Sequence, residues 1–193
     1  LGDFPTHERF VRDIVADSGF TAIFVNYTPS PEAKYPTALN EIHAAAKWAA
    51  AHGAEIRVDA SRLAIFGNSV GGNMSAAVAL KALHEGSPKF KCQILLWPVT
   101  DANFDTGSYH EFAEGYFLSR AMMQWFWNAY APDTAKRSEI YASPLQAAKD
   151  QLKACRRPSY KLQAPMSCAT RASRTRDISM PPVWTQQSCA TKI

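Results

Sequence analysis

A lone hydroxyl stands among glycines in the stretch GNSVGGN, residues 67–73. The residues before it, 63–66, are apolar and unbroken, as in a buried strand. The residues after it, 74–83, are rich in alanine and leucine, which favour a helix. Ser69 is therefore predicted at a strand-to-helix corner, where it either caps the helix or serves as a nucleophile.

The spacing of Gly67, Ser69 and Gly71 fits the nucleophile elbow G-x-S-x-G, a strained turn that raises the serine hydroxyl above a sheet. We expect Gly67 and Gly71 to be required because larger side chains would collide across so sharp a turn, and Gly72 is a third glycine of this elbow. The amide of Val70, at the helix start, is expected to point toward a developing oxyanion. The predicted chemistry is attack on a carbonyl carbon.

Phosphate binding is the rival use of a glycine-rich corner between strand and helix. No lysine follows these glycines and no G-x-G-x-x-G is present, so both nucleotide fingerprints fail and no cofactor is expected. The four cysteines, Cys92, Cys155, Cys168 and Cys189, form no CxxC pair, and we predict neither a disulfide framework nor a metal site.

The elements that must position this corner alternate along the chain. Residues 21–27, 62–66 and 92–99 have the apolar and β-branched character of strands. Helices are predicted after Thr6 as a cap, from Pro36 through Ala49, over 71–85, and after Ser119. This alternation predicts an α/β fold with a parallel sheet covered on both faces. The apolar face of the last helix is either core or the wall of a pocket, and is formed by Met122, Met123, Phe126 and Trp127.

Charge divides the 193 residues unevenly, although their number suits a single domain. Residues 155–193 carry seven Lys or Arg and one Asp, without helical or strand periodicity, whereas the rest is slightly acidic. We predict that residues 154–193 are a disordered basic tail that adds no strand to the sheet in register. No run approaches a membrane span and no signal-peptide pattern opens the chain, so a cytoplasmic location is expected.

Four segments, in order, resemble the hormone-sensitive-lipase-like family of α/β-hydrolases. These are NYTPSPEAKYPTAL, VDASRLAIFG, GNSVGGN and WPVTDANFDTGSY, and the resemblance covers residues 1–153. It implies a partial α/β-hydrolase domain over 1–153, incomplete at both ends. It also implies a serine esterase or lipase-like enzyme for small-molecule carboxylic esters, with Ser69 as nucleophile. From the residues themselves we expect no nucleic-acid partner and no membrane span. The oligomeric state is left open.

Two departures from the family pattern concern the partners of Ser69. The family's H-G-G-G oxyanion loop lies upstream of a segment like LGDF, with which this sequence begins. Its histidine lies near the C-terminus, whereas no histidine follows His110 here. We expect all five histidines to be surface or helix residues, and we assign no catalytic acid or histidine.

The tail suggests a one-nucleotide frameshift near Ala154. With suitable codons, the alternative frame reads GLPPSLIQTAGADVLRDEGEP, which resembles the family's missing strand and acid. Three hypotheses follow for this chain: a serine carboxylesterase, a catalytically inactive truncated or frameshifted fragment, and a module that binds nucleic acid through its basic tail. The third has little support, because Tyr160 and Trp184 are the tail's only aromatic residues.

Overall fold

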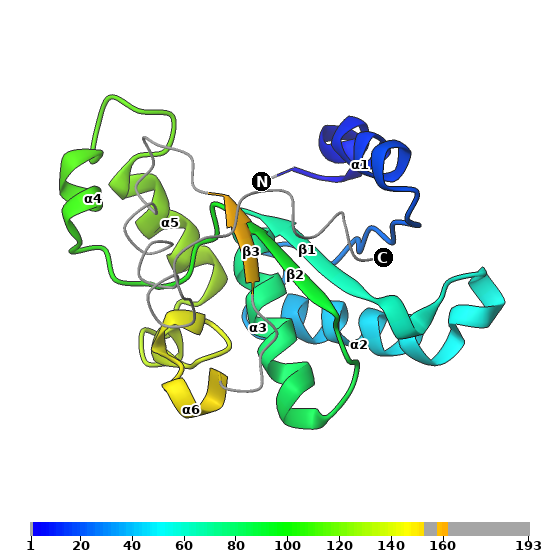
Figure 1. The fold of residues 1–193 in the computed structure, drawn as a ribbon. Coiled ribbons are helices and arrows are strands. Elements are labelled where there is room, and N and C mark those ends of the chain that lie inside the picture. Colours follow the sequence, from blue (N-terminus) through cyan, green and yellow to red (C-terminus); the bar gives the residue numbers. More distant parts are fainter. Residues whose placement is uncertain (1, 153–157, 162–193) are drawn as a thin grey trace.

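The computed structural model describes residues 2–152 and 158–161 (Figure 1). The described chain contains both helices and strands, together with four short 3-10 helices. In chain order these elements are α1 (Phe4–Ser18), α2 (Thr37–His52), η1 (Gly53–Ile56), η2 (Ala60–Arg62), β1 (Ala64–Asn68), α3 (Val70–Glu85), β2 (Cys92–Leu96), α4 (Gly107–Glu111), α5 (Arg120–Tyr130), η3 (Lys136–Ser138), η4 (Pro144–Gln146), α6 (Lys149–Leu152) and β3 (Pro158–Lys161).

The described strands form one parallel sheet in the order β1-β2-β3, which confirms the predicted α/β class. β2 is central, and its last residue, Leu96, is the register partner of Asn68 in β1 and of Lys161 in β3. Since parallel strands end at the same edge, the residues that follow β1 and β2 emerge side by side. This edge carries the Gly67–Asn73 corner.

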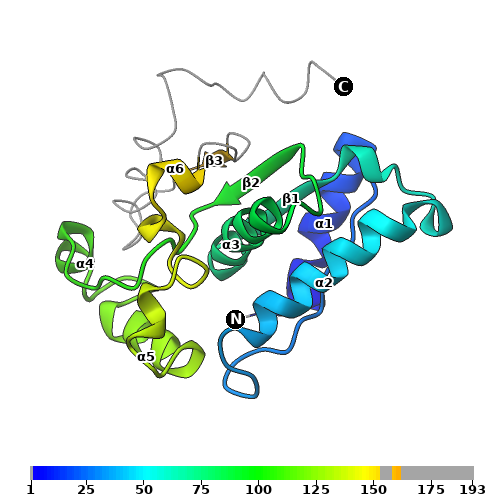
Figure 2. The ribbon, with the colours of Figure 1, turned by 90° about the horizontal axis from the view of Figure 1, so that it is seen from below.

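The two faces of the sheet are covered unequally. Side chains alternate between faces along a strand, and in β1 Ile65 packs against the main core. Phe66 meets Phe10 of α1 instead, with ring centroids 5.4 Å apart. Figure 1 shows α1 above the sheet and α2 and α3 below it, and Figure 2 gives the view from below. Phe66 remains 37% exposed, so α1 covers its face only loosely.

The core lies between the sheet, α2, α3 and the segment that contains α4 and α5. Its fully buried members come from distant parts of the chain and include Leu39, Val78 and Tyr109. Met123 and Trp127 are buried in it as well, whereas Met122 on the same helix is 38% exposed. The predicted apolar face of α5 is therefore core in part. Figure 2 shows α4 and α5 grouped at the opposite end of the molecule from α1 and α2.

Several helix ends follow the sequence signals. Gly19 ends α1 in the left-handed conformation at φ 69°, and Ser119 caps α5 by accepting a hydrogen bond from the Met122 amide. Thr6, predicted as the cap of α1, is not the cap. Asp3 is, and Thr6 completes a capping box with it because each side chain bonds the other residue's backbone amide.

The strand predicted over residues 21–27 is absent from the described structure, so this prediction was wrong. The segment is extended but has no described partner: no backbone-to-backbone hydrogen bond involves residues 20–27. Ile23 and Phe24 are 47% and 39% exposed. Apolar, β-branched composition favours a strand only where a neighbouring strand supplies the hydrogen bonds.

A second correction concerns the basic tail. Pro158–Lys161 forms β3, parallel to β2, so the prediction that residues 155–193 add no strand in register was wrong for these four residues. Backbone pairing along the free edge of β2 needs no side-chain periodicity in so short a segment. Residues 162–193 lie outside the described chain, and the domain boundary near residue 153 stays a prediction.

Candidate active site

Ser69 occupies the corner between β1 and α3, as predicted from the sequence. β1 ends at Asn68 and α3 begins at Val70, and Ser69 between them has φ 52° and ψ −119°. A positive φ is uncommon in a residue with a side chain and marks a strained backbone. The hydroxyl makes no capping bond to α3, and no hydrogen bond to it occurs in the described chain. The capping alternative is therefore removed.

The corner is held by backbone hydrogen bonds to the neighbouring strand. The Ser69 amide donates to the Leu96 carbonyl at 2.9 Å, and the Ser69 carbonyl accepts from the amide of Val99 at 3.3 Å and from that of Asn73 at 3.1 Å. The last residue of β2 and the loop after it thus each hold Ser69 by a hydrogen bond. A strained conformation persists where its surroundings over-determine it in this way.

Two of the three elbow glycines are sterically required. A Cβ on Gly67 would lie 2.1 Å from the carbonyl oxygen of Gly71, which is backbone and has no freedom to rotate away. A Cβ on Gly72 would lie 2.9 Å from the Pro98 Cβ. These glycines let β1, α3 and the chain after β2 approach one another closely.

Gly71 differs from this expectation. A Cβ built on it would meet nothing within 4 Å in the described chain, and its φ is not in the left-handed region. The prediction that Gly71 is needed to avoid a collision was therefore wrong for these residues. What Gly71 contributes to the turn is its carbonyl, the group that keeps position 67 a glycine.

Val70 is the first residue of α3, and no hydrogen bond to its amide is formed within the described residues. The amides of a helix's first turn have no partner inside the helix and carry a partial positive charge. The Val70 amide is thus available to an anion beside Ser69, and its role as the oxyanion donor stays a prediction.

Asn73 supports this corner structurally, a role that the sequence analysis did not predict. It is 3% exposed, and its amide nitrogen donates to the carbonyls of Val99 at 2.6 Å and Ala142 at 2.8 Å. One side chain thereby ties α3 to the chain after β2 and to the segment after α5. The available signal was an asparagine, a poor helix former, inside a predicted helix.

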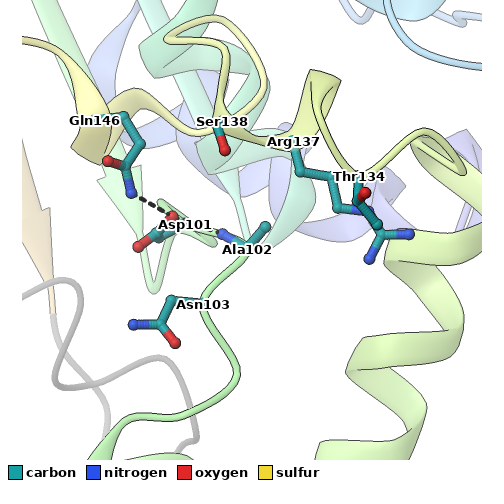
Figure 3. A pocket seen from close by; sticks show the side chains of 7 residues that line it. All are labelled: Asp101, Ala102, Asn103, Thr134, Arg137, Ser138 and Gln146. Atoms are coloured by element: carbon teal, nitrogen blue, oxygen red, sulfur yellow. Dashed lines mark hydrogen bonds between the residues drawn. The ribbon is translucent and has the colours of Figure 1, made fainter.

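The sequence analysis also did not predict a polar cavity of about 280 Å³, which lies between the chain after β2 and the chain after α5 (Figure 3). Asp101, 7% exposed, accepts hydrogen bonds from the Ala102 amide at 2.8 Å and from the Gln146 side chain at 3.0 Å. The other residues that line the cavity come from the loop after β2 and from the chain after α5. They include Asn103, Thr134, Arg137 and Ser138. Only the fold brings these segments together.

None of the five histidines hydrogen-bonds to Ser69 in the described structure. Four of them form a hydrogen bond through a ring nitrogen with a residue other than Ser69. The pairs are His7 with Asp3, His52 with Trp48, His84 with Tyr141 and His110 with Asp105. His43 on α2 is 4% exposed, with a ring nitrogen 3.3 Å from the Ser87 carbonyl. This agrees with the expectation that all five are surface or helix residues.

Other site classes find no support in residues 2–152 and 158–161. No group of three or more His, Cys, Asp or Glu side chains is placed to hold a metal ion there. Among the helices of this part, none combines the length and apolar character that a bilayer crossing requires.

Comparison with known proteins gives the family. A family model described as alpha/beta hydrolase fold matches residues 1–160, and the chain belongs to this family. The ethyl acetate hydrolase of Pseudomonas putida is 32% identical over 148 residues, 75% of this chain and 46% of that protein. The carboxylic ester hydrolase LipN of Mycobacterium tuberculosis is 34% identical over 153 residues, 76% of this chain and 41% of that protein.

The solved structures agree. A thermostable esterase from Pseudomonas putida ECU1011 is 51% identical, with a TM-score of 0.90, over 92% of this chain and 56% of that chain. Structures of the esterase rPPE, 50% identical, include a serine-to-alanine mutant complexed with (S)-Ac-CPA and a tryptophan-to-histidine mutant. The chain thus spans less than half of the two curated relatives and little more than half of these esterases.

Proposed function

We propose that this chain carries the nucleophile of a hydrolase that acts on carboxylic esters. The observation that carries the proposal is Ser69, held at a strained φ of 52° between a parallel strand and a helix N-terminus, with its hydroxyl unused by the helix cap. The names of the relatives, an ethyl acetate hydrolase and a carboxylic ester hydrolase, support the same reaction class.

The proposed reaction has two stages. The Ser69 oxygen attacks the ester carbonyl carbon while a base takes its proton, and the negative oxygen that forms accepts a hydrogen bond from the Val70 amide. The bond to the alcohol then breaks, the alcohol leaves with a proton, and an acyl-serine remains. Water hydrolyses this intermediate, which releases the acid and restores the serine.

None of the described histidines hydrogen-bonds to Ser69, and we assign no base among them. This observation favours the second candidate, in which the 193-residue chain by itself is catalytically inactive. A serine hydroxyl without a base is a poor nucleophile, and enzymes that lose triad members keep only about 10³–10⁴-fold acceleration over water.

The substrate class is proposed to be small esters. Ethyl acetate hydrolysis is named for one relative, and rPPE was solved with (S)-Ac-CPA. In rPPE the replaced serine and the replaced tryptophan stand as far apart along the chain as Ser69 and Trp97 do here. This equal spacing supports the interpretation that Ser69 corresponds to the serine that was replaced in the ligand complex of rPPE.

The test compares this chain with a chimera in which a related esterase supplies the base and the other residues that act with the serine. In the Pseudomonas putida esterase, the corresponding segment is exchanged for residues 2–152 of this chain. We expect negligible hydrolysis of p-nitrophenyl acetate and butyrate by the 193-residue chain and clear turnover by the chimera. Ser69→Ala in the chimera should lower kcat by at least about 10³-fold, because nucleophile and base act as a unit.

The matched control is Ser87→Ala, an exposed serine after the far end of α3, which should leave kcat within about twofold because surface substitutions are usually close to neutral. Equal turnover by the chain alone and the chimera would contradict the proposed need for added partners. A chimera whose turnover survives Ser69→Ala would contradict the assignment of the nucleophile.

A further inference from the structure

The loop between α4 and α5 and the outer side of α5 leave large apolar side chains exposed. Phe117 is 91% exposed and Trp125 is 62% exposed, and Tyr116 and Met122 are exposed as well. These four residues are called the apolar patch below. Single exposed apolar side chains are ordinary, but a group of large ones that lie close together marks an interaction surface.

The packing of α5 turns the apolar patch away from the core. Met123 is buried in the core, whereas Met122 and Trp125, three residues apart on the helix, share its solvent side. In the loop before the helix, Leu118 packs against the same core, and Phe117 beside it extends into solvent. The patch therefore follows the outer side of α5 and the loop that leads into it.

The apolar patch lies toward the same end of the molecule as Ser69. The loop that leads to α4 and α5 starts from the carboxyl end of β2, whose last residue, Leu96, accepts a hydrogen bond from the Ser69 amide. Figure 2 shows α4 and α5 at the end of the molecule toward which β2 points. A surface that docked on the patch would approach the edge of the sheet that carries the proposed nucleophile.

Acidic side chains are absent from the stretch that carries the apolar patch. From residue 115 to residue 132 the sequence contains one charged residue, Arg120, and the nearest acids along the chain, Glu114 and Asp133, stand outside the stretch. Aromatic rings with a polar atom, such as those of Tyr116 and Trp125, favour a boundary between water and an apolar phase. The composition of the patch thus suits the surface of a lipid bilayer.

Positive charge continues from the same edge of the sheet. β3 ends at Lys161, the register partner of Leu96, and residues 162–193 follow it in the chain. Residues 161–193 contain five Lys or Arg and one Asp. Basic segments next to an apolar anchor are attracted to membranes that contain anionic lipids. The charge at this end therefore complements an anionic lipid surface rather than a neutral one.

We propose that this end of the molecule docks on a lipid bilayer surface that carries anionic headgroups. The apolar patch enters the boundary between headgroups and acyl chains, and no part of the chain crosses the bilayer. The basic residues supply the second attraction, because a single weak anchor binds a membrane only marginally and stable docking takes two signals. The inference goes beyond the proposed ester chemistry and does not depend on it, so Ser69→Ala should leave docking unchanged.

The test measures how the 193-residue chain co-sediments with sucrose-loaded vesicles. One preparation contains phosphatidylcholine alone, and the other mixes two parts of phosphatidylcholine with one part of phosphatidylserine. We expect binding to the mixed vesicles to be at least about tenfold stronger, because each Lys or Arg near an anionic surface strengthens binding about fivefold. The difference should shrink at high salt, which screens this attraction.

Two double variants separate the apolar patch from the rest of the surface. Phe117→Ser with Trp125→Ser should weaken binding to the mixed vesicles by at least about tenfold, because burial of one large apolar side chain is worth about that factor or more. Trp48→Ser with Ile56→Ser is the matched control. It removes two exposed apolar side chains from α2 and η1 and should leave binding unchanged. Urea unfolding of both variants checks that neither loses its fold.

A second measurement reports insertion of the patch itself. Brominated phosphatidylcholine in the mixed vesicles quenches the emission of tryptophan rings that reach the acyl chains. Trp125→Phe keeps an apolar ring and should keep binding, but the quenched share of the tryptophan emission should fall. An unchanged share would mean that Trp125 does not enter the bilayer and would contradict the proposed placement.

Other outcomes would also overturn the proposal. Equal binding to the two kinds of vesicle, or binding to neither, contradicts an anionic lipid surface. Full binding by the Phe117 and Trp125 double variant shows that the patch takes no part. If the parent chain self-associates without lipid, and this double variant stays monomeric but binds vesicles equally well, the patch is a contact between copies instead. None of these results bears on ester hydrolysis, which the chimera tests.

Discussion

Two regions of this molecule share a sequence pattern but differ in what surrounds it. In the elbow region, residues 64–99, the apolar segment β1 pairs with β2, and hydrogen bonds fix the residue that follows its end. In the N-terminal region, residues 4–27, α1 has no buried residue and the apolar segment 21–27 has no described backbone partner. The difference teaches that an apolar pattern becomes a strand only where another strand completes its hydrogen bonds.

The largest loss of stability in either region is expected when one methyl group is added at position 67. Gly67→Ala puts a Cβ against the Gly71 carbonyl oxygen, so β1 and α3 must separate, at a cost of about 3 kcal/mol or more in the free energy of unfolding. Gly71→Ala is the matched control and should be neutral or stabilise by up to about 1 kcal/mol, because alanine favours helix. Urea unfolding measures both, and equal losses would contradict this account of the elbow.

Asn73 gives the next effect. Asn73→Ala leaves the buried carbonyls of Val99 and Ala142 without their donor and should cost about 2–3 kcal/mol in the free energy of unfolding. Asn40→Ala, at an exposed position of α2, should change stability by less than about 0.5 kcal/mol. If both asparagine variants unfold at the same urea concentration, Asn73 does not tie these segments together.

A substitution to alanine in the N-terminal region should lower the free energy of unfolding only slightly. Phe10→Ala removes the ring that meets Phe66, but Phe10 is already 39% exposed, and we expect a loss of about 1 kcal/mol. Burial of an aromatic core residue usually makes such a change cost about 3–5 kcal/mol. A loss in that larger range would show that α1 is packed as firmly as the elbow.

Hydrogen exchange compares the two regions directly. The amides of residues 21–27 should exchange at least about 10³-fold faster than those of residues 93–95 in β2, because unpaired backbone is unprotected whereas a central strand opens with the core. Equal protection in the two segments would mean that residues 21–27 have a strand partner in solution.

The smallest effect is at the far end of α3. The Lys81 ammonium at 3.0 Å, followed by charge from His43, lowers the pKa of the Glu85 carboxyl below its usual 4.5. A lowered pKa in the folded state means that the stabilisation is present above pH 4.5 and is lost as the pH falls through the folded value. Acid titration of unfolding should be shallower in Glu85→Gln than in the parent, and unchanged slopes would contradict this contribution.

Much of the elbow could be predicted from local sequence. The glycine spacing placed Ser69 between strand and helix, and Ser119 and Gly19 marked helix ends, because capping and turn geometry depend on residues a few positions apart. The role of Asn73 was not predictable in this way. Its partners lie 26 and 69 residues further along the chain, and no local pattern records them.

The sequence by itself determined the order of β1, α3 and β2 and the position of Ser69 between the first two, since both follow from residue type and short spacing. Tertiary structure alone decided that residues 21–27 stay unpaired while Pro158–Lys161 joins β2. It also decided that Gly67 and Gly72 are indispensable where Gly71 is not. The physical reason is that backbone pairing and close approach depend on which segments become neighbours, and a segment's own residues do not specify its neighbours.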